Sequence, residues 1–277
     1  MQRRLLLTLP LLATLPARAA DEPRKSTALP SVHTLIEPLP MPGLNRMRTL
    51  RVCLPPSYER EPERRYPVLY MHDGQNLFDA ATSYAGEWGV DETMAALACD
   101  TGFEAIVIGI DNGGEHRNTE MAPYDHAKLG KAEGPAYLDF IVHTAKPMVD
   151  RTLRTKPGRE HTALIGSSLG GLISHAAMLW HGEVFSRYGL FSPSYWAAPR
   201  LFDDTAGAKL PAGTHVHLYC GGQEGDMAAD TRRMHMVLKP LLPARQLSLH
   251  IAPQGEHNEA AWRDELPRAL RALFKLG

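Results

Sequence analysis

The chain has 277 residues, of which 44% are hydrophobic, and it carries 30 Lys and Arg against 31 Asp and Glu. This length is enough for one large domain with a sizeable core. A net charge of −1 argues against nucleic acid as the main partner, because neutralising phosphates requires a basic surplus. Three cysteines are too few for a disulfide scaffold.

The first residues have the pattern of an export signal. A short basic start, Met1 to Arg4, precedes a hydrophobic run from Leu5 to Leu15 that is too short to span a bilayer. Ala17-Arg18-Ala19 then fits the small-x-small pattern of a cleavage site. We therefore predict a signal peptide over residues 1–19 and a periplasmic or secreted protein without stable membrane insertion. The alternative is a buried N-terminal helix, which two prolines would interrupt.

Cleavage after Ala19 would leave 258 residues (277 less 19) and change the net charge from −1 to −4, because it removes three arginines and no acid. Residues 20–44 contain several prolines and mixed charge, so we expect a loose lead-in with one edge strand near Val32 to Glu37. Residues 45–277 show no internal repeat and no linker. They are predicted to form one domain.

From Met47 on, short apolar runs alternate with segments of helical period. The predicted strands are Arg51–Leu54, Val68–Met71, Ala105–Ile110, Ala163–Gly166, His215–Cys220 and Leu247–Ile251. The predicted helices are Val90–Ala98, Ala136–Leu153, Ser168–Trp180, Met227–Leu241 and Glu259–Leu276. Such alternation is typical of an α/β fold with a mostly parallel sheet and helices on both faces, here with an antiparallel edge from the early strands.

The strongest local motif is Gly166-Ser167-Ser168-Leu169-Gly170-Gly171. It follows an apolar strand and opens a helix, which is the context of a G-x-S-x-G nucleophile turn. The turn requires small neighbours and exposes Ser168 at its tip, beside the positive end of a helix. The alternative is a small-residue turn used only for packing.

A serine nucleophile needs a base, and the base needs an orienting acid. On this kind of scaffold the order along the chain is serine, acid, histidine, which leaves His235, His250 and His257 as bases. His235 lies in a helical pattern and His250 in a strand, whereas His257 follows the last strand, where a loop can carry it over Ser168. We therefore predict His257 as the base and expect the other histidines to be structural.

The acid is expected just after the strand that ends at Cys220. Glu224 and Asp226 both lie there, and they are too close in sequence for both to face the histidine. Glu224 is preferred because it directly follows the glycine turn, which leaves Asp226 as a helix N-cap.

Two backbone amides are expected to stabilise an oxyanion. One belongs to Leu169, the residue after the nucleophile, and the other to the loop after the strand Val68–Met71. In that loop Gln75 is the predicted donor, and Gly74 clears space for it. The alternative is an ordinary turn, because Asp-Gly is a common turn dipeptide.

With these residues in place, the chain from Arg48 to Leu276 resembles the putative-esterase branch of the α/β-hydrolases. This group includes enterochelin-esterase-like siderophore hydrolases, S-formylglutathione hydrolases, feruloyl and acetylxylan esterases, and mycolyltransferases. The resemblance rests on the combination of Leu54–Tyr58, Tyr66–Tyr70, Asp73–Asp79, Trp88, Arg117–Pro123, Gly166–Gly171 and Phe191–Trp196. It implies an α/β-hydrolase fold over residues 45–277, here expected without a large cap domain.

The resemblance also implies roles for individual residues. It assigns Ser168 as nucleophile, His257 as base and an acid at the Gly-x-x-acid position, which is Glu224 here. In the mycolyltransferase relatives the residue after Asp-Gly supplies the oxyanion amide, which corresponds to Gln75. The siderophore-hydrolase branch can work with a weak or absent acid, so Glu224 is the least fixed member. Nothing in the sequence selects one substrate branch.

Candidate pocket residues are fewer. Arg117 lies on a loop after a strand, where it could meet an anionic or phenolic group of a substrate, or instead pair with Glu120 or a neighbour. Trp196 and Trp88 could line the pocket or anchor loops. His215-x-His217 lacks further ligands at a telling spacing, so we expect no metal.

The predicted activity is hydrolysis of a small-molecule carboxylic ester through an acyl-enzyme, with no cofactor. The same triad could transfer the acyl group to another alcohol, or cleave a thioester or peptide bond. A rival of another class is an exported binding protein without catalysis, which loss of Ser168 or His257 would have favoured.

Overall fold

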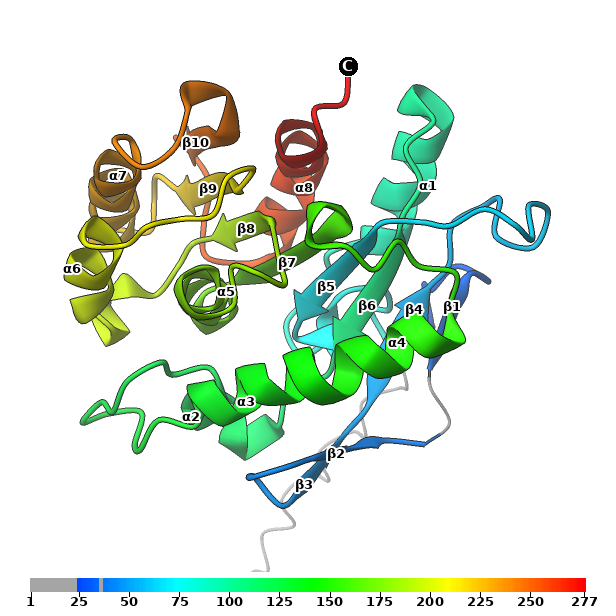
Figure 1. Cartoon of the computed structure of the whole chain (residues 1–277), viewed down its shortest axis with the longest axis horizontal. Coiled ribbons are helices and arrows are strands. Elements are labelled where there is room, and N and C mark those ends of the chain that lie inside the picture. The colour runs from blue at the N-terminus through cyan, green and yellow to red at the C-terminus, as the bar shows by residue number, and fades with distance from the viewer. Residues whose placement is uncertain (1–23, 35–36) are drawn as a thin grey trace, which may run out of the picture.

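A computed structural model describes residues 24–34 and 37–277. Its centre is an eight-stranded sheet in the order β1-β4-β6-β5-β7-β8-β9-β10 (Figure 1). The strands are β1 (Val32–Thr34), β4 (Leu50–Cys53), β5 (Val68–His72), β6 (Ile106–Ile110), β7 (Thr162–Ser167), β8 (Arg187–Phe191), β9 (His215–Gly221) and β10 (Leu247–Ala252). β1 and β4 pair antiparallel and the other six are parallel, which confirms the predicted α/β class and its antiparallel edge.

Helices cover both faces of this sheet because each central strand is apolar on both sides. On β7, for example, Leu164 points into one hydrophobic core, whereas Ala163 and Ile165 point into the other. The helices α1 (Val90–Thr101) and α8 (Glu259–Phe274) cover one face. The helices α3 (Gly134–Phe140), α4 (Lys146–Thr152), α5 (Leu169–Trp180), α6 (Arg200–Ala206) and α7 (Asp226–Leu238) cover the other face.

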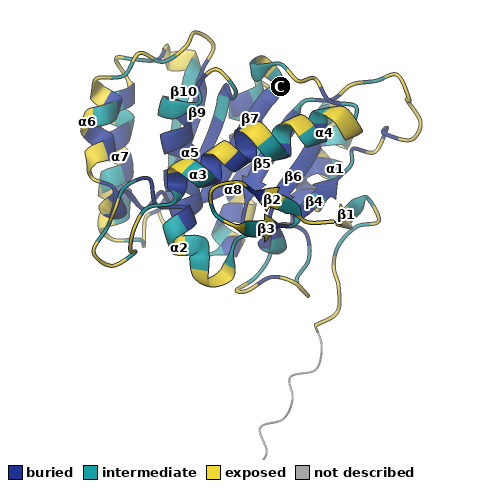
Figure 2. Ribbon diagram, turned by 60° about the horizontal axis from the view of Figure 1, so that its bottom comes forward, coloured by how far each residue is buried: buried dark blue, intermediate teal, exposed yellow. Residues whose placement is uncertain are grey.

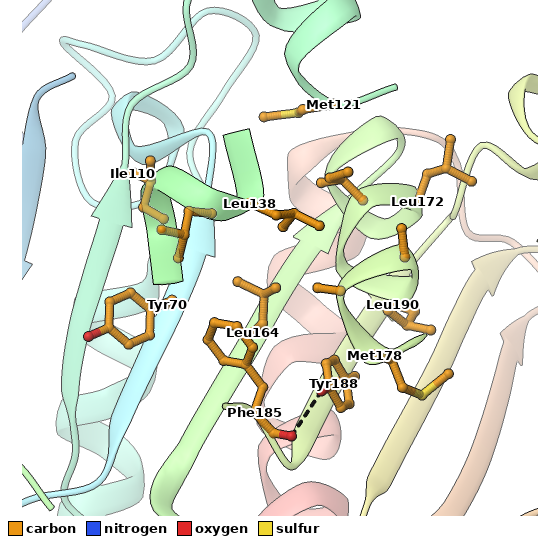
Figure 3. Close-up of a cluster of buried hydrophobic side chains, with 14 of the residues drawn as sticks. Tyr70, Ile110, Met121, Leu138, Leu164, Leu172, Met178, Phe185, Tyr188 and Leu190 are labelled. Carbon is orange, nitrogen blue, oxygen red and sulfur yellow. Dashed lines mark hydrogen bonds between the residues drawn. The ribbon is translucent and has the colours of Figure 1, made fainter. Parts of the chain in front are cut away.

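The larger core shows how the layers meet. Leu164 and Leu190 from the sheet point toward Leu172 and Met178 of α5, and the Tyr188 hydroxyl donates to the carbonyl of Phe185 over 2.9 Å (Figure 3). The central strands β5, β6, β7 and β9 are buried throughout, whereas β1 and β10 at the sheet edges are partly exposed. Helices α3 and α4 expose their outer faces (Figure 2). No helix in residues 24–34 and 37–277 is both long enough and apolar enough to cross a membrane.

Several elements were not predicted from the sequence, among them both strands of the small sheet described below, and one helix is more complex than predicted. Strand β8 and helix α6 are additional, and α2 (Arg117–Glu120) is a single turn. The helix expected over Ala136–Leu153 is α3 and α4 joined by a π-helical stretch, Ile141–Ala145. Pro147 explains this stretch, because proline has no N–H to donate and its ring crowds the carbonyl four residues earlier.

The lead-in is not loose over its described part, contrary to expectation. Thr27 donates from Oγ1 to Glu87 over 2.6 Å, and Ser26 and the Leu29 amide donate to Asp79 and Asp91 over 2.9 and 2.8 Å. Strand β1 then pairs with β4. A second small sheet follows, formed by β2 (Leu39–Met41) and β3 (Arg46–Arg48). The predicted signal peptide, residues 1–19, lies outside the described residues.

All three cysteines are free thiols. Cys53 and Cys220 are buried, and burial raises the pKa of each thiol to about 12. Cys99 is exposed on α1. Because the thiolate is the reactive form, Cys99 should react far faster than the other two.

We therefore expect one thiol per chain to react rapidly with Ellman's reagent in the native protein, and three in denaturant. The Cys99→Ser variant should lose the rapid phase and keep two thiols that react only on unfolding. Rapid reaction of either remaining thiol in native Cys99→Ser protein would contradict the described burial of Cys53 and Cys220.

Candidate active site

Ser168 lies at a sharp turn between β7 and α5. Its backbone is in a sparsely populated region, with φ 57° and ψ −122°, and its amide donates to the carbonyl of Phe191 over 2.9 Å. Such a conformation costs on the order of 1–3 kcal/mol and occurs mainly at functional sites. The turn needs glycine at position 166, where a Cβ would come within 2.6 Å of the Gly170 backbone. The sequence thus builds the sharp turn that the motif predicts, with Ser168 partly exposed.

His257 and Glu224 form a hydrogen-bonded pair. His257 lies in the loop between β10 and α8, and its Nδ1 is 2.6 Å from Oε2 of Glu224. The imidazole is 38% exposed, whereas the carboxylate is only 1% exposed. Asp226 is exposed, and it is the first residue of α7 rather than the N-cap, which is Gly225. Of the two candidate acids, the fold brings Glu224 to the histidine.

The Glu224 carboxylate is held in its charged form. Burial raises the pKa of Glu224, but hydrogen bonds from His257, the Ser192 hydroxyl and the Gly221 amide lower it more. The net pKa is therefore below the ordinary value of 4.5. An ionised acid beside Nδ1 fixes the tautomer that leaves Nε2 free to accept a proton.

Ser168 is held by a second serine. Ser168 Oγ lies 3.1 Å from Oγ of Ser194, and the Ser194 amide donates to the Ser168 carbonyl over 3.1 Å. Within residues 24–34 and 37–277, no hydrogen bond joins Ser168 to His257, His235 or His250. Catalytic hydrogen bonds commonly form or tighten only when substrate binds.

The two predicted oxyanion donors, Leu169 and Gln75, lie in segments that each directly follow a strand. Leu169 is the first residue of α5, so its N–H has no partner within the helix. Gln75 is in a short 3₁₀ turn, Gly74–Asn76, directly after β5. The Gln75 side chain accepts from the Asn112 amide over 2.9 Å, which anchors this turn to the loop after β6.

Arg117 is paired with Asp73, not with Glu120. Its Nε and Nη2 donate to the two Asp73 oxygens over 2.6 and 2.9 Å, while Glu120 binds Arg46 and Arg48. Burial raises the pKa of Asp73, but Arg117 and Asn112 lower it further, and the net pKa is below its usual range. Because Asp73 has φ 56° and immediately precedes the Gln75 turn, this ion pair fixes the start of that turn.

The tryptophans have different roles. Trp196 directly follows the Ser194–Tyr195 pair, is 47% exposed and packs edge-on against His126. Trp88 is buried against Phe191 and Trp262 and anchors the core. Trp196 is therefore an exposed aromatic side chain two residues after Ser194, which contacts Ser168.

A second serine, histidine and glutamate are joined by hydrogen bonds among β9, β10 and α8, apart from the Ser168 turn. Ser248 Oγ lies 2.8 Å from Nδ1 of His217, whose Nε2 is 2.9 Å from Glu265. Glu265 also binds His250 over 2.5 Å. His217 is only 1% exposed and Ser248 lies within strand β10, so this group has neither access nor helix amides for an oxyanion. The described residues contain no group of three side chains able to hold a metal.

Ser192, Ser194, Asp73 and Asn112 were missed as site residues by the sequence analysis. The first two belong to the segment Phe191–Trp196, and the resemblance included this segment without giving it a role. Asp73 and Asn112 follow adjacent strands β5 and β6, so their meeting could have been inferred from strand order.

The chain matches the family described as "Putative esterase" over residues 42–273. It is 26% identical over 242 residues to "Uncharacterized protein YbbA" of Bacillus subtilis, covering 82% of this chain and 92% of that protein. It is 29% identical to the "Iron(III) salmochelin esterase" of Escherichia coli, covering 72% of this chain but only 48% of that protein. The chain thus spans about half the length of that siderophore esterase.

Solved structures of related enzymes share the fold. The BES protein of Bacillus cereus has a TM-score of 0.68 at 19% identity, covering 90% of this chain and 97% of that one. The enterobactin esterase FES of Shigella flexneri, in the presence of enterobactin, has a TM-score of 0.72 at 18% identity, covering 90% of this chain and 60% of that one. The chain belongs to the "Putative esterase" family of the α/β-hydrolase superfamily and is a carboxylic ester hydrolase.

Proposed function

We propose that the protein is an exported serine esterase that cleaves small-molecule esters through Ser168, His257 and Glu224. The observation that carries the proposal is the 2.6 Å contact between His257 and the buried Glu224, in the same chain as the strained turn that presents Ser168. The names of the siderophore and feruloyl esterase relatives support a siderophore- or carbohydrate-linked ester as the substrate class.

In the proposed reaction, His257 Nε2 takes the proton of Ser168 as Oγ attacks the ester carbonyl. The amides of Leu169 and Gln75 donate to the oxyanion, and His257 then protonates the departing alcohol. Water, activated by the same histidine, releases the acid from the acyl-enzyme. Glu224 stays ionised and stabilises the imidazolium in both steps.

The nucleophile can be tested directly. Ser168→Ala should lower kcat for p-nitrophenyl ester hydrolysis by at least about 10³-fold, because the covalent step is lost. It should also abolish labelling by a fluorophosphonate probe. Measured on short-chain, feruloyl and ferric-siderophore esters, the loss should hold for every substrate that the wild type cleaves.

Ser248→Ala is the matched control, because Ser248 is the serine of the second serine–histidine–glutamate group. This variant should keep the activity and the labelling of the wild type. Unchanged hydrolysis by Ser168→Ala would refute the proposed nucleophile, and loss of labelling in Ser248→Ala alone would transfer the role.

The acid is tested by a matched pair of neutral variants. Glu224→Gln should lower kcat by about 10²- to 10⁴-fold, since the amide no longer fixes the His257 tautomer or stabilises its charge. Asp226→Asn should change kcat by less than about threefold, because it removes only an exposed charge at a helix terminus. The reverse ranking would assign the acid to Asp226.

Export is proposed from the basic start, the apolar run and the Ala17-Arg18-Ala19 site. Expressed in a bacterial host with its full sequence, the protein should be recovered outside the cytoplasm with Ala20 as its first residue, as read by intact mass. Ala19→Arg should block this processing, because signal cleavage needs a small residue there. A wild-type mass that retains residues 1–19 would contradict the proposal.

A further inference from the structure

The segment after β8 contains a serine in an unusual backbone conformation. Ser192 has φ 43°, in the left-handed region, and is completely buried. Its amide donates to the carbonyl of Tyr219 on the neighbouring strand β9 over 2.7 Å. A non-glycine residue rarely adopts such a conformation unless its surroundings impose it, and such residues cluster at functional sites.

The Ser192 hydroxyl has two partners, and their chemistry fixes the direction of both hydrogen bonds. Trp262 Nε1 lies 3.0 Å from Oγ, and an indole can only donate. Ser192 Oγ is thus the acceptor in that contact. Its single proton is then free for the second partner, Oε1 of the Glu224 carboxylate, over 2.6 Å. The short distance is typical of a hydroxyl that donates to an ionised oxygen.

The two carboxylate oxygens of Glu224 have different hydrogen-bond partners. Oε1 accepts from Ser192 and from the Gly221 amide, both over 2.6 Å, while Oε2 faces Nδ1 of His257. The Gly221 amide precedes Glu224 in the same turn, so it moves with the acid. Ser192 is the donor that ties the carboxylate to a different strand, β8, the strand whose last residue accepts from the Ser168 amide.

Trp262 closes the same arrangement from the helix α8. Its ring meets the His257 imidazole edge-on, with centroids 5.0 Å apart and an interplanar angle of 85°. Through Nε1 it also orients the Ser192 hydroxyl. One indole therefore contacts the base and, through Ser192, the acid.

We propose that Ser192, oriented by Trp262, is a positioning residue that holds Glu224 in the orientation needed by His257. This inference rests on the proposed function of Ser168, His257 and Glu224. Ser192 makes no described hydrogen bond to the Ser168 hydroxyl or to His257, so its direct hydrogen bond to the proposed triad is the one to Glu224.

Other titratable groups lie near the His257–Glu224 pair, and none of them is substituted in the variants described below. Tyr219 and Cys220 lie on β9 beside Glu224, and burial raises the pKa of each to about 12, so both are neutral at working pH. Glu259 on α8 lies near His257, Asp73 and Arg117, and burial raises its pKa. A shift between wild type and a Ser192 variant therefore reports on the His257–Glu224 pair.

Ser192→Ala should lower kcat by about 10- to 100-fold with KM within about twofold, the loss typical when a partner that orients a catalytic group is removed. With one donor fewer, the carboxylate is more basic and binds the imidazolium more strongly. The acid limb of the kcat/KM–pH profile should thus move to higher pH by roughly a few tenths of a unit. A purely structural role would not move it.

A double-mutant cycle decides between positioning and structure. In a Glu224→Ala background, Ser192→Ala should cost less than about threefold in kcat, because the residue through which it acts is gone. An equal loss in both backgrounds, or an unmoved acid limb in the single variant, would overturn the inference. Activity of wild type, and its loss in Ser168→Ala, report on the proposed function independently of either result.

Two further variants protect the test against misfolding. Ser192→Gly removes the hydroxyl but tolerates the left-handed backbone, so it should lose as much kcat as Ser192→Ala while keeping a wild-type melting temperature. Ser192→Cys restores a weak donor and should recover part of the loss. Full activity in Ser192→Gly would show that the hydroxyl is dispensable and would also overturn the inference.

Discussion

The strained backbone of Ser168 constrains the residues that pack around its turn. A serine at φ 57° and ψ −122° persists only if its neighbours hold it, because the conformation itself is unfavourable. Three contacts do so: the Ser168 amide to Phe191, the Ser194 amide to the Ser168 carbonyl, and the close approach of Gly166 to Gly170. The first two come from the end of β8 and the residues just after it, so the conformation of Ser168 depends on the strand next to its own.

The same short segment also reaches the acid. The two serines after Phe191 contact different residues. Ser194 contacts Ser168, which follows β7, and Ser192 contacts Glu224, which follows β9. The sheet order β7-β8-β9 explains this, because β8 lies between the strand that leads to the nucleophile and the strand that leads to the acid. Pro193 lies between the two serines, and its fixed φ angle limits the backbone freedom of the segment that carries both hydroxyls.

Sequence reasoning agrees best with the structure where a local pattern carries the information. Ser168 lies between a strand and a helix as its motif predicts, and His257 contacts Glu224 as chain order and the strand ends suggested. The catalytic roles of these three residues stay predictions. Strand β8 was missed because Arg187 and Gly189 break its apolar run, and α6 because it is short and contains two adjacent aspartates. Contacts between distant residues were beyond its reach, such as Arg117 with Asp73, 44 residues apart.

That last contact changes how substrate recognition should be understood. Arg117 was the candidate for binding an anionic group of the substrate. Its Nε and Nη2 already donate to the carboxylate of Asp73, which is buried. Asp73 uses two of the five guanidinium N–H groups, so an anion that approaches the other three need not displace it. An anion that took the place of Asp73 would free the residue that precedes the Gln75 turn, and only that mode of recognition would disturb a predicted oxyanion donor. Contacts with the exposed Trp196 leave both the ion pair and this turn intact, and Trp196 lies on the segment whose Ser194 contacts Ser168.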